Sequence, residues 1–467
     1  MCGCLAAGCS SSSSRSGGSA STAAPTTSQS SSPTPSNAAP TPPTPMVGQW
    51  YKGDLHSHSA PYSQDAQRQY GDSPGVCFQL AEYVGLDFLA LTDHRTFDQV
   101  NDPTYSANTL TILSGCEWGG TVHIGMVGLT QPLSQYTVDQ SRGPSTLNGQ
   151  IQQIYNEVHA QGGVVITNHP CDPAKLHVWL SHQFDAVEVW NAYWNFPDWK
   201  DANEQQVDDK VASLGLAQAG EDANDEIREA VRHQGGGPNH QALKFYEANL
   251  MRGRHVAAVG GGDRHSLVFP GLPTTYVYAA DQSREKILQG IREGRTWVGA
   301  HEGPVVEFSA DADGDGIYEA LIGDSVPLNQ TVNFKVRVTN GKDGLLEVIK
   351  DGVVAHSVPL PTDDETFSFS STASQRAWYR LDVFEHVDFS VPQSNGFQVL
   401  ALAGGLGGQA GAAALTTLGL PMGFQVSIGG TRAPHIRLPH AYDKILNFDR
   451  THWGYSRGAI TSPIWAE

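Results

Sequence analysis

The chain of 467 residues is poor in positive charge. It has 29 Lys and Arg against 48 Asp and Glu, which gives a formal net charge of −19. Because contacts to a phosphate backbone need clustered Lys and Arg, this balance argues against nucleic acid as the main partner. Small phosphorylated substrates stay open, since bound metal cations can reverse the local field.

Cysteine is scarce, and no two cysteines stand in a C-x-x-C motif. This argues against a thiolate zinc site and against a redox pair. Three of the six cysteines lie in the first nine residues, and we expect Cys77, Cys116 and Cys171 to pack as small hydrophobic residues. The sequence also contains no G-x-S-x-G, so it offers no sign of a serine nucleophile of that type.

Long hydrophobic runs are absent as well. No stretch of 18 residues has the composition of a membrane helix. The nearest candidate, residues 399–424, has no charge but is interrupted repeatedly by Gly, Gln, Thr and Pro. We interpret it as an insertion of small residues.

The N-terminus begins "MCGCLAAGCSSSSS", in which "LAAGC" resembles a bacterial lipobox with Cys9 as the lipidated cysteine. The Ser/Thr/Pro/Ala-rich stretch that follows, to about Pro45, predicts a disordered tether. Only eight residues precede Cys9, fewer than a signal peptide needs, so a Ser-rich tail on a soluble protein is the alternative. We expect residues 1–46 to be a lipobox-like segment and linker, and the protein to be an exported, periplasmic or membrane-anchored lipoprotein of a bacterium.

Residues 47–302 alternate short apolar segments with helical patterns. "SPGVCFQLAEYVG" has start and stop signals of a helix, and "STLNGQIQQIYNEVHAQGG" has one apolar helical face. Two more helices are predicted in "NHQALKFYEANLMRG" and "SREKILQGIREG". The predicted strands are "WYKGDL", "DFLALTDH", "LTILSGCEW", "TVHIGMVGL", "GVVITNHP", "DAVEVWN", "HVAAVGGGDRH" and "RTWVG". This alternation predicts an α/β fold with a parallel sheet or barrel.

The stretch "GDLHSHS" places His56 and His58 two residues apart where the first predicted strand ends. Residues i and i+2 of a strand share a face, so both imidazoles can point at one metal ion. Taken alone, the pair is equally compatible with two solvated loop histidines.

More side chains of metal-ligand type recur at the ends of later strands. His94 ends "LALTDH", Glu117 ends "ILSGCE", His169 ends "VVITNH", and Asp263 and His265 end "VAAVGGGDRH". In a β/α barrel the carboxyl ends of the strands face one pocket, so these residues are expected to meet there. So many His, Asp and Glu residues at the ends of strands are hard to explain as residues of a hydrophobic core.

The ordered motifs "DLHSHS", "LTDH", "GCEW", "NHP" and "GGGDRH" resemble the PHP (polymerase and histidinol phosphatase) superfamily of metallohydrolases. "GLPTTYVYAADQSREKILQGIREGRTWVG" and the tail ending "AITSPIW" resemble its carbaryl-hydrolase (CehA/McbA-like) branch. The resemblance implies a distorted (β/α)7 barrel that holds two or three divalent metal ions. The implied ligands are His56, His58, Asp65, His94, Glu117, His123, His169, Asp263 and His265. Arg264 and a polar insertion at about residues 200–240 depart from the pattern; the insertion is a lid or a solvated helix pair.

Imidazole and carboxylate ligands without thiolate suit Zn, Mn or Fe. Paired ions would lower the pKa of a shared water, so the expected nucleophile is metal-bound hydroxide. Asp54 and Asp93 could orient ligand imidazoles or be ordinary turn residues. Arg95 and Arg264, beside ligands, could hold a substrate anion or form surface salt bridges.

These arginines favour a phosphoesterase. A carboxyl-ester or carbamate hydrolase is the alternative, with Trp118, Trp190 and Trp194 as an apolar wall. A non-catalytic surface binding protein with a structural metal site is the second alternative. Such a site closes its coordination with about four ligands, so nine candidates favour an enzyme acting on a small ester or phosphoester.

Residues 303–467 are expected to form a β-rich domain that carries the small-residue insertion. Segments such as "VNFKVRVTN" and "WYRLDVFEH" alternate apolar and polar residues, which predicts a small antiparallel β-sandwich. "DADGDGIYEALIGD" resembles a calcium loop, but its twelfth position is Ile322 in place of the expected Glu. The interpretation favoured here is an acidic hairpin turn.

Overall fold

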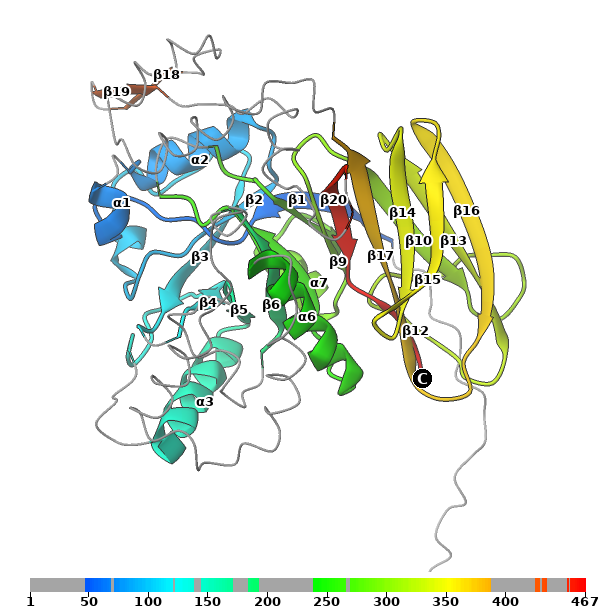
Figure 1. Ribbon diagram of the computed structural model, residues 1–467. Helices are drawn as coiled ribbons and strands as arrows, with labels where there is room; N and C mark the ends of the chain where they lie inside the picture. The colour runs from blue at the N-terminus through cyan, green and yellow to red at the C-terminus, as the bar shows by residue number, and fades with distance from the viewer. Residues whose placement is uncertain are drawn as a thin grey trace, which may run out of the picture. The chain divides into compact units, whose positions relative to one another are not determined.

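The computed structural model describes much of the chain (Figure 1). The described residues are 47–68, 71–120, 122–137, 144–170, 184–192, 238–265, 269–387, 425–428, 431–434, 452 and 454–467. The lipobox-like segment, the linker, the small-residue insertion, and the polar insertion up to residue 237 lie outside these ranges. Within them, no helix is both long and apolar enough to span a membrane.

Seven strands run side by side through the first part of the large sheet. They are β1 (Gln49–Asp54), β2 (Phe88–Leu91), β3 (Thr111–Trp118), β4 (Ile124–Val127), β5 (Val164–Thr167), β6 (Ala186–Asn191) and β7 (Ala257–Gly261). All neighbours are parallel except β4, which is antiparallel to both β3 and β5. Beyond β1 and β7, Ser57 forms a bridge with Arg264, so the segments that follow the first and seventh strands also meet.

The hydrophobic core beneath this arrangement receives residues from β1 to β7 and from α7 (Arg284–Arg292). Alternate residues of β5 face opposite sides: Val164 and Ile166 join this inner cluster, and Val165 joins the outer one. Helix α7 contacts β3, β5 and β8, which are not neighbours in the sheet, so it lies across one end of the strands.

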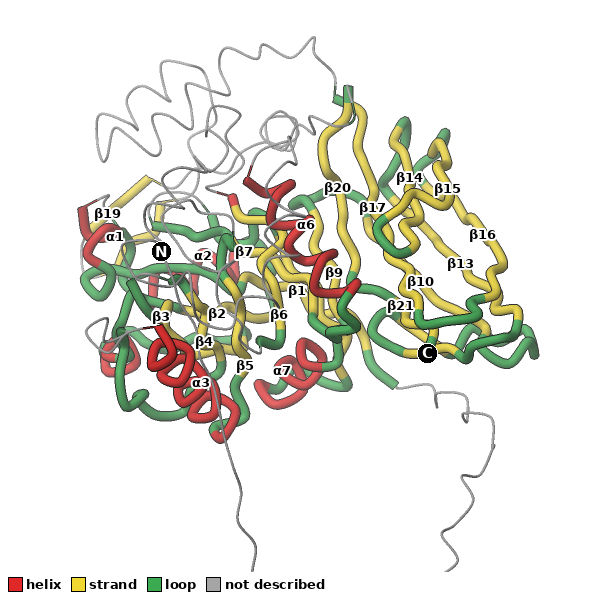
Figure 2. The backbone as a smooth tube through the Cα atoms, turned by 60° about the horizontal axis from the view of Figure 1, so that its bottom comes forward, coloured by secondary structure: helices red, strands yellow, loops and turns green. Residues whose placement is uncertain are grey.

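Three other helices each pack on one strand of the large sheet (Figure 2). Helix α2 (Pro74–Tyr83) packs on β2, α3 (Pro144–Ala160) on β5, and α6 (Pro238–Met251) on β6. Two short helical segments, α1 (Gln64–Arg68) and η1 (Asp98–Asn101), lie in the loops after β1 and β2. The four predicted helices are therefore confirmed, whereas α1 was not predicted.

The regular alternation of a (β/α)7 barrel is not confirmed; the fold is mixed α/β, with a large sheet and few helices among the described residues. A parallel crossover needs a dozen or more residues, and only the short segment 119–123 joins β3 to β4. The chain therefore reverses direction there. The sequence also did not predict β8 (Thr274–Ala279), which is antiparallel to β1 and to β9 (Thr296–Gly299).

The antiparallel strands predicted after residue 303 are present. One sheet contains β10 (Val305–Asp311), β11 (Ala320–Leu321), β13 (Thr331–Thr339) and β16 (Asp364–Thr372). The facing strands are β12 (Ser325–Val326), β14 (Gly344–Lys350), β15 (Val353–Leu360), β17 (Ala377–His386), β20 (Tyr455–Thr461) and β21 (Ile464–Ala466). Both sets share one hydrophobic core. A separate hairpin joins β18 (Gln425–Ile428) and β19 (Thr431–Pro434).

The large sheet crosses the boundary expected at residues 302 and 303. Strand β20 pairs with β9, so the sheet runs from the C-terminal strands through β9 and β8 to β1. Trp297 of β9 accordingly lies in the same core as Phe334 and Leu381 of the later strands.

Candidate metal centre

The nine side chains proposed as metal ligands meet at one edge of the β1–β7 strands. His56 and His58 follow β1, His94 follows β2, and Glu117 lies near the end of β3. His169 follows β5, while Asp263 and His265 follow β7. His123 reaches the same edge because it directly precedes β4, which runs in the opposite direction. Asp65, in α1, joins them from the loop after β1.

Glu117 lies at the middle of the cluster. Its Oε1 is 3.0 Å from Nδ1 of His123, 3.1 Å from Nε2 of His169 and 3.4 Å from Nε2 of His56. Its Oε2 is 2.9 Å from Nδ1 of His94 and 3.6 Å from Nε2 of His58. One buried carboxylate thus faces five imidazoles, an arrangement suited to bridging two cations.

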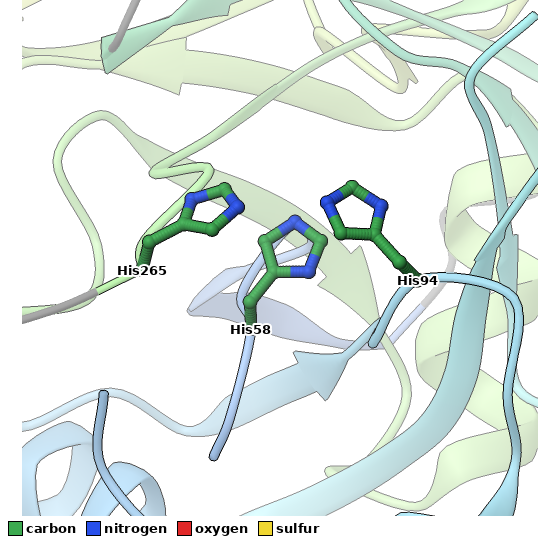
Figure 3. A group of neighbouring side chains, drawn as sticks. All are labelled: His58, His94 and His265. Atoms are coloured by element: carbon green, nitrogen blue, oxygen red, sulfur yellow. The ribbon is translucent and has the colours of Figure 1, made fainter. Parts of the chain in front are cut away.

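Two further carboxylates extend the cluster. Oδ1 of Asp263 is 3.3 Å from Nε2 of His56 and 3.2 Å from Nε2 of His58. Oδ2 of Asp65 is 2.9 Å from Nε2 of His94 and 3.3 Å from Nε2 of His265. Figure 3 shows the imidazoles of His58, His94 and His265 side by side, although they come from three separate segments.

Burial decreases from one side of the cluster to the other. His56, His58 and Glu117 are almost fully buried. His94 and His123 are partly exposed, and the side chain of Asp65 is 44% exposed. A substrate would therefore approach from the side of Asp65, His94 and His123.

The charges in this cluster perturb one another. Burial opposes charging of His56, but the negative charges of Asp263, Glu188 and Glu117 outweigh it and raise its pKa well above the usual range. Burial, reinforced by the nearby His265 and His94, lowers the pKa of His58 to about 3. The surrounding histidines hold the pKa of Glu117 and of Asp263 well below normal despite burial. Metal binding requires neutral imidazoles and ionised carboxylates, so His58 and the two carboxylates are already in the binding form, whereas His56 would release a proton when a cation binds.

The residues fit divalent metal ions. Nε2 of His58 is buried and makes no hydrogen bond, although it faces carboxylate oxygens. At least three ligand atoms lie within 4.8 Å of one another in four overlapping groups. The groups are His58, His94 and His265; His56, His169 and Asp263; His56, His58 and Glu117; and His94, Glu117 and His123. An imidazole and carboxylate donor set suits Zn, Mn or Fe.

Three non-glycine residues at the same edge have positive φ. His169 has φ of 26°, Asp263 has φ of 47°, and Arg95, next to His94, has φ of 54°. Non-glycine residues with positive φ cost free energy and persist where surrounding structure holds them, often at functional sites. Two of these three residues are themselves proposed ligands, and the third directly follows one.

A supporting carboxylate, Glu188, was missed by the sequence analysis. It lies in β6, is buried, and its Oε1 is 2.9 Å from Nδ1 of His56. Its Oε2 accepts hydrogen bonds from the backbone N–H of His169 and from the side chain of Asn191. A charged residue inside the apolar strand "AVEVWN" was the available signal.

Substitution Glu188→Gln is expected to weaken metal binding by about 10- to 100-fold, since carboxylates that orient a ligand histidine typically contribute this much. Metal affinity, measured by competition with a chelator, checks it. Glu307→Gln, at an exposed position of β10, is the matched control. Unchanged affinity in Glu188→Gln would show that the contact to His56 has no such role.

The hydrogen bonds of Asp54 go to backbone N–H groups, and those of Asp93 go to the backbone and hydroxyl of Ser59 and to the hydroxyl of Ser63. Asp54 accepts hydrogen bonds from the backbone N–H groups of His56, Gly262 and Gly271, so it ties β1 to the segments after β7. Burial raises the pKa of Asp54 and of Asp93 to about 6, against the lowering effect of their hydrogen bonds. Asp93 reaches His58 only through Ser63, whose hydroxyl lies between the two side chains. Both aspartates had been expected to contact a ligand imidazole directly. Glu188 makes such a contact, to His56.

The structure separates the two arginines. The guanidinium of Arg264 is buried and forms an ion pair with Asp72, and its Nη1 is 3.4 Å from the sulfur of Cys77. This placement argues against its expected contact with a substrate anion, because its charge is already used inside the protein. Arg95 is exposed and makes no ion pair with a described residue, so its expected role stays a prediction.

The apolar wall expected from three tryptophans is not formed by Trp118 or Trp190. Both are buried in the outer hydrophobic core, and Nε1 of Trp118 donates a hydrogen bond to the backbone of Gln135. Trp194 lies outside the described residues. Trp118 and Trp190 were wrongly predicted because proximity in sequence to a ligand does not fix which side of a strand faces the site.

Comparison with known proteins gives weak likenesses. No family model matches the chain, and no curated protein matches it. One similar solved structure is a two-domain protein from Bacteroides vulgatus containing a predicted PHP-like metal-dependent phosphoesterase. It is 14% identical, with a TM-score of 0.34, over 74% of this chain and 95% of that one. Another is PsfC from Pseudomonas syringae, 14% identical, with a TM-score of 0.28, over 52% and 87%. At such TM-scores the inference of function depends on the site itself.

Proposed function

We propose that this protein is a metal-dependent hydrolase of the PHP superfamily, in its CehA/McbA-like branch, and that it holds two or three divalent ions. The observation that carries the proposal is the convergence of six imidazoles and three carboxylates on one rim of the strands. A structural zinc site uses about four ligands and closes its coordination. This larger and partly open set fits catalysis better than the alternative of a non-catalytic binding protein.

The ligand groups would hold the ions, and the protein would supply position and charge. Bound divalent ions would provide Lewis acidity and would lower the pKa of a bound water toward neutral pH. Glu188 would keep the ring of His56 in one orientation, and Ser63 would do the same for His58. The partial exposure of His94, His123 and Asp65 leaves this side open to a substrate.

The substrate class proposed is a phosphoester. Its support is Arg95, whose side chain is exposed directly after His94 in the sequence. A guanidinium pairs well with phosphate oxygens. A carboxyl-ester or carbamate hydrolase is the alternative, although neither Trp118 nor Trp190 is available to line a pocket for a neutral substrate.

Substitution Arg95→Ala is expected to lower kcat/KM for a phosphodiester or monoester at least about tenfold, roughly 1.4 kcal/mol of transition-state stabilisation. Activity on an uncharged aryl ester should hardly change, because that substrate offers no anion to the guanidinium. Lys342→Ala, at an exposed position before β14, is the control.

The experiment uses metal-loaded protein, its metal content measured, against nitrophenyl phosphates, a nitrophenyl carboxylic ester and an aryl methylcarbamate. Turnover of the neutral esters with none of the phosphoesters would favour the alternative substrate class. Two or three bound ions with no turnover of any of them would favour the binding protein.

A further inference from the structure

We propose that the loop between β10 and β11 is a calcium site, distinct from the metal centre and formed by Asp311, Asp313, Asp315 and Glu319. Asp311 ends β10, and Glu319 immediately precedes β11. The four residues each offer a carboxylate oxygen, and these oxygens all lie within 4.8 Å of one another.

These spacings match the size of a calcium coordination sphere. Ca²⁺ binds oxygen at about 2.3–2.6 Å, so ligand oxygens on opposite sides of one ion are roughly 5 Å apart. Four oxygens that all lie within 4.8 Å of one another can therefore contact a single ion. The donor set contains oxygen alone, which suits a hard cation such as calcium better than zinc or iron.

Glu319 gives independent support for a ligand. Its side chain is partly buried, and its Oε2 is inaccessible to solvent and makes no hydrogen bond. Its Oε1 accepts a hydrogen bond from the backbone N–H of Ala312, which holds the carboxylate over the loop. Leaving a carboxylate oxygen buried without a partner is costly, and a cation among these oxygens would remove that cost.

The fold explains why the sequence pattern favoured an acidic turn instead. In a calcium loop of the EF-hand type the twelfth residue is a Glu, and Ile322 occupies that position here, fully buried in the hydrophobic core. The carboxylate comes instead from the ninth position, Glu319, because the chain enters β11 directly afterwards. Gly316, at the sixth position, has φ of 90°, as the sharp turn of such a loop requires.

The charges around the loop favour the binding of a cation. No Lys or Arg forms an ion pair with these four carboxylates in the described ranges, while the ammonium of Lys335 lies 5.5 Å from the centre of the Tyr318 ring. Asp311 also accepts a hydrogen bond from Asn333 of β13. A bound ion would therefore link β10, β11 and β13 at one end of their sheet and stabilise it.

Calcium titration of the full chain, with its metal centre already loaded, tests the site. We expect one saturable calcium ion per chain, with a Kd of about 0.1–1 mM as in extracellular modules, and a rise in Tm. Terbium should compete for the loop and show luminescence sensitised by the ring of Tyr318.

Variants locate the ion. The double substitution Asp313→Asn and Asp315→Asn changes exposed side chains, and Glu319→Gln keeps the shape of the side chain whose Oε2 makes no hydrogen bond. Each should weaken calcium binding at least tenfold, whereas Asp363→Asn, at an exposed carboxylate outside the loop, should leave it unchanged. Binding should also persist in His56→Ala, which separates this site from the metal centre. Absence of saturable binding up to 10 mM calcium, or binding that survives both loop variants, would overturn the proposal.

Discussion

Substitution His56→Ala or Asp263→Asn is expected to abolish hydrolysis while the protein stays folded. The expected loss in kcat is at least about 10³-fold, roughly 4 kcal/mol of transition-state stabilisation. His56 lies within 3.4 Å of Glu117 and 3.3 Å of Asp263, so its loss would remove a donor shared by two of the ligand groups. Asn keeps the size of Asp263 but removes the charge that faces His56 and His58.

Folding should survive because the inner hydrophobic core lies below the cluster and contains neither side chain. Circular dichroism and Tm check the fold, and metal content and turnover check the site. The matched control is His386→Ala, which removes an exposed histidine at the end of β17. If either site variant turned over normally with full metal content, the cluster would not be the catalytic centre.

Sequence reasoning located this cluster because ligand positions at strand ends depend on local patterns. Strand periodicity placed His56, His94 and His169 at the ends of β1, β2 and β5, and the parallel arrangement brought those ends together. The role of His123 rested on resemblance alone. Its physical reason, the reversal of β4, depends on the short turn before that strand.

Other parts depended on contacts that no local pattern encodes. Glu188 supports His56 across 132 residues of sequence, and this contact depends on the pairing of the strands. The regular alternation of a (β/α)7 barrel is not confirmed, because periodicity finds apolar segments but does not set the direction of the next strand. The same limit applies to Glu319, whose place over the loop depends on where the chain enters β11.

Arg264 shows most clearly the difference between a local sequence pattern and a contact that depends on the folded chain. Its position between Asp263 and His265 predicted contact with a substrate, yet its side chain turns inward to Asp72, 192 residues away in sequence. Its carbonyl also accepts a hydrogen bond of 2.8 Å from the backbone N–H of His58. The residue thus fixes the backbone on which three ligands stand.

Substitution Arg264→Ala is therefore expected to destabilise the fold by about 3–5 kcal/mol, the usual result of removing one partner of a buried ion pair. Urea denaturation measures this loss. Metal affinity should fall together with stability, and turnover of charged and neutral esters should fall alike, unlike the selective effect expected for Arg95→Ala.

The double variant Arg264→Met with Asp72→Asn removes both charges and should recover most of the stability, because a neutral buried pair needs no compensating charge. An Arg264→Ala protein of normal stability that loses activity only on phosphoesters would place the guanidinium at the substrate after all. Failure of the double variant to recover would instead assign the loss to packing around Cys77, whose sulfur the guanidinium contacts.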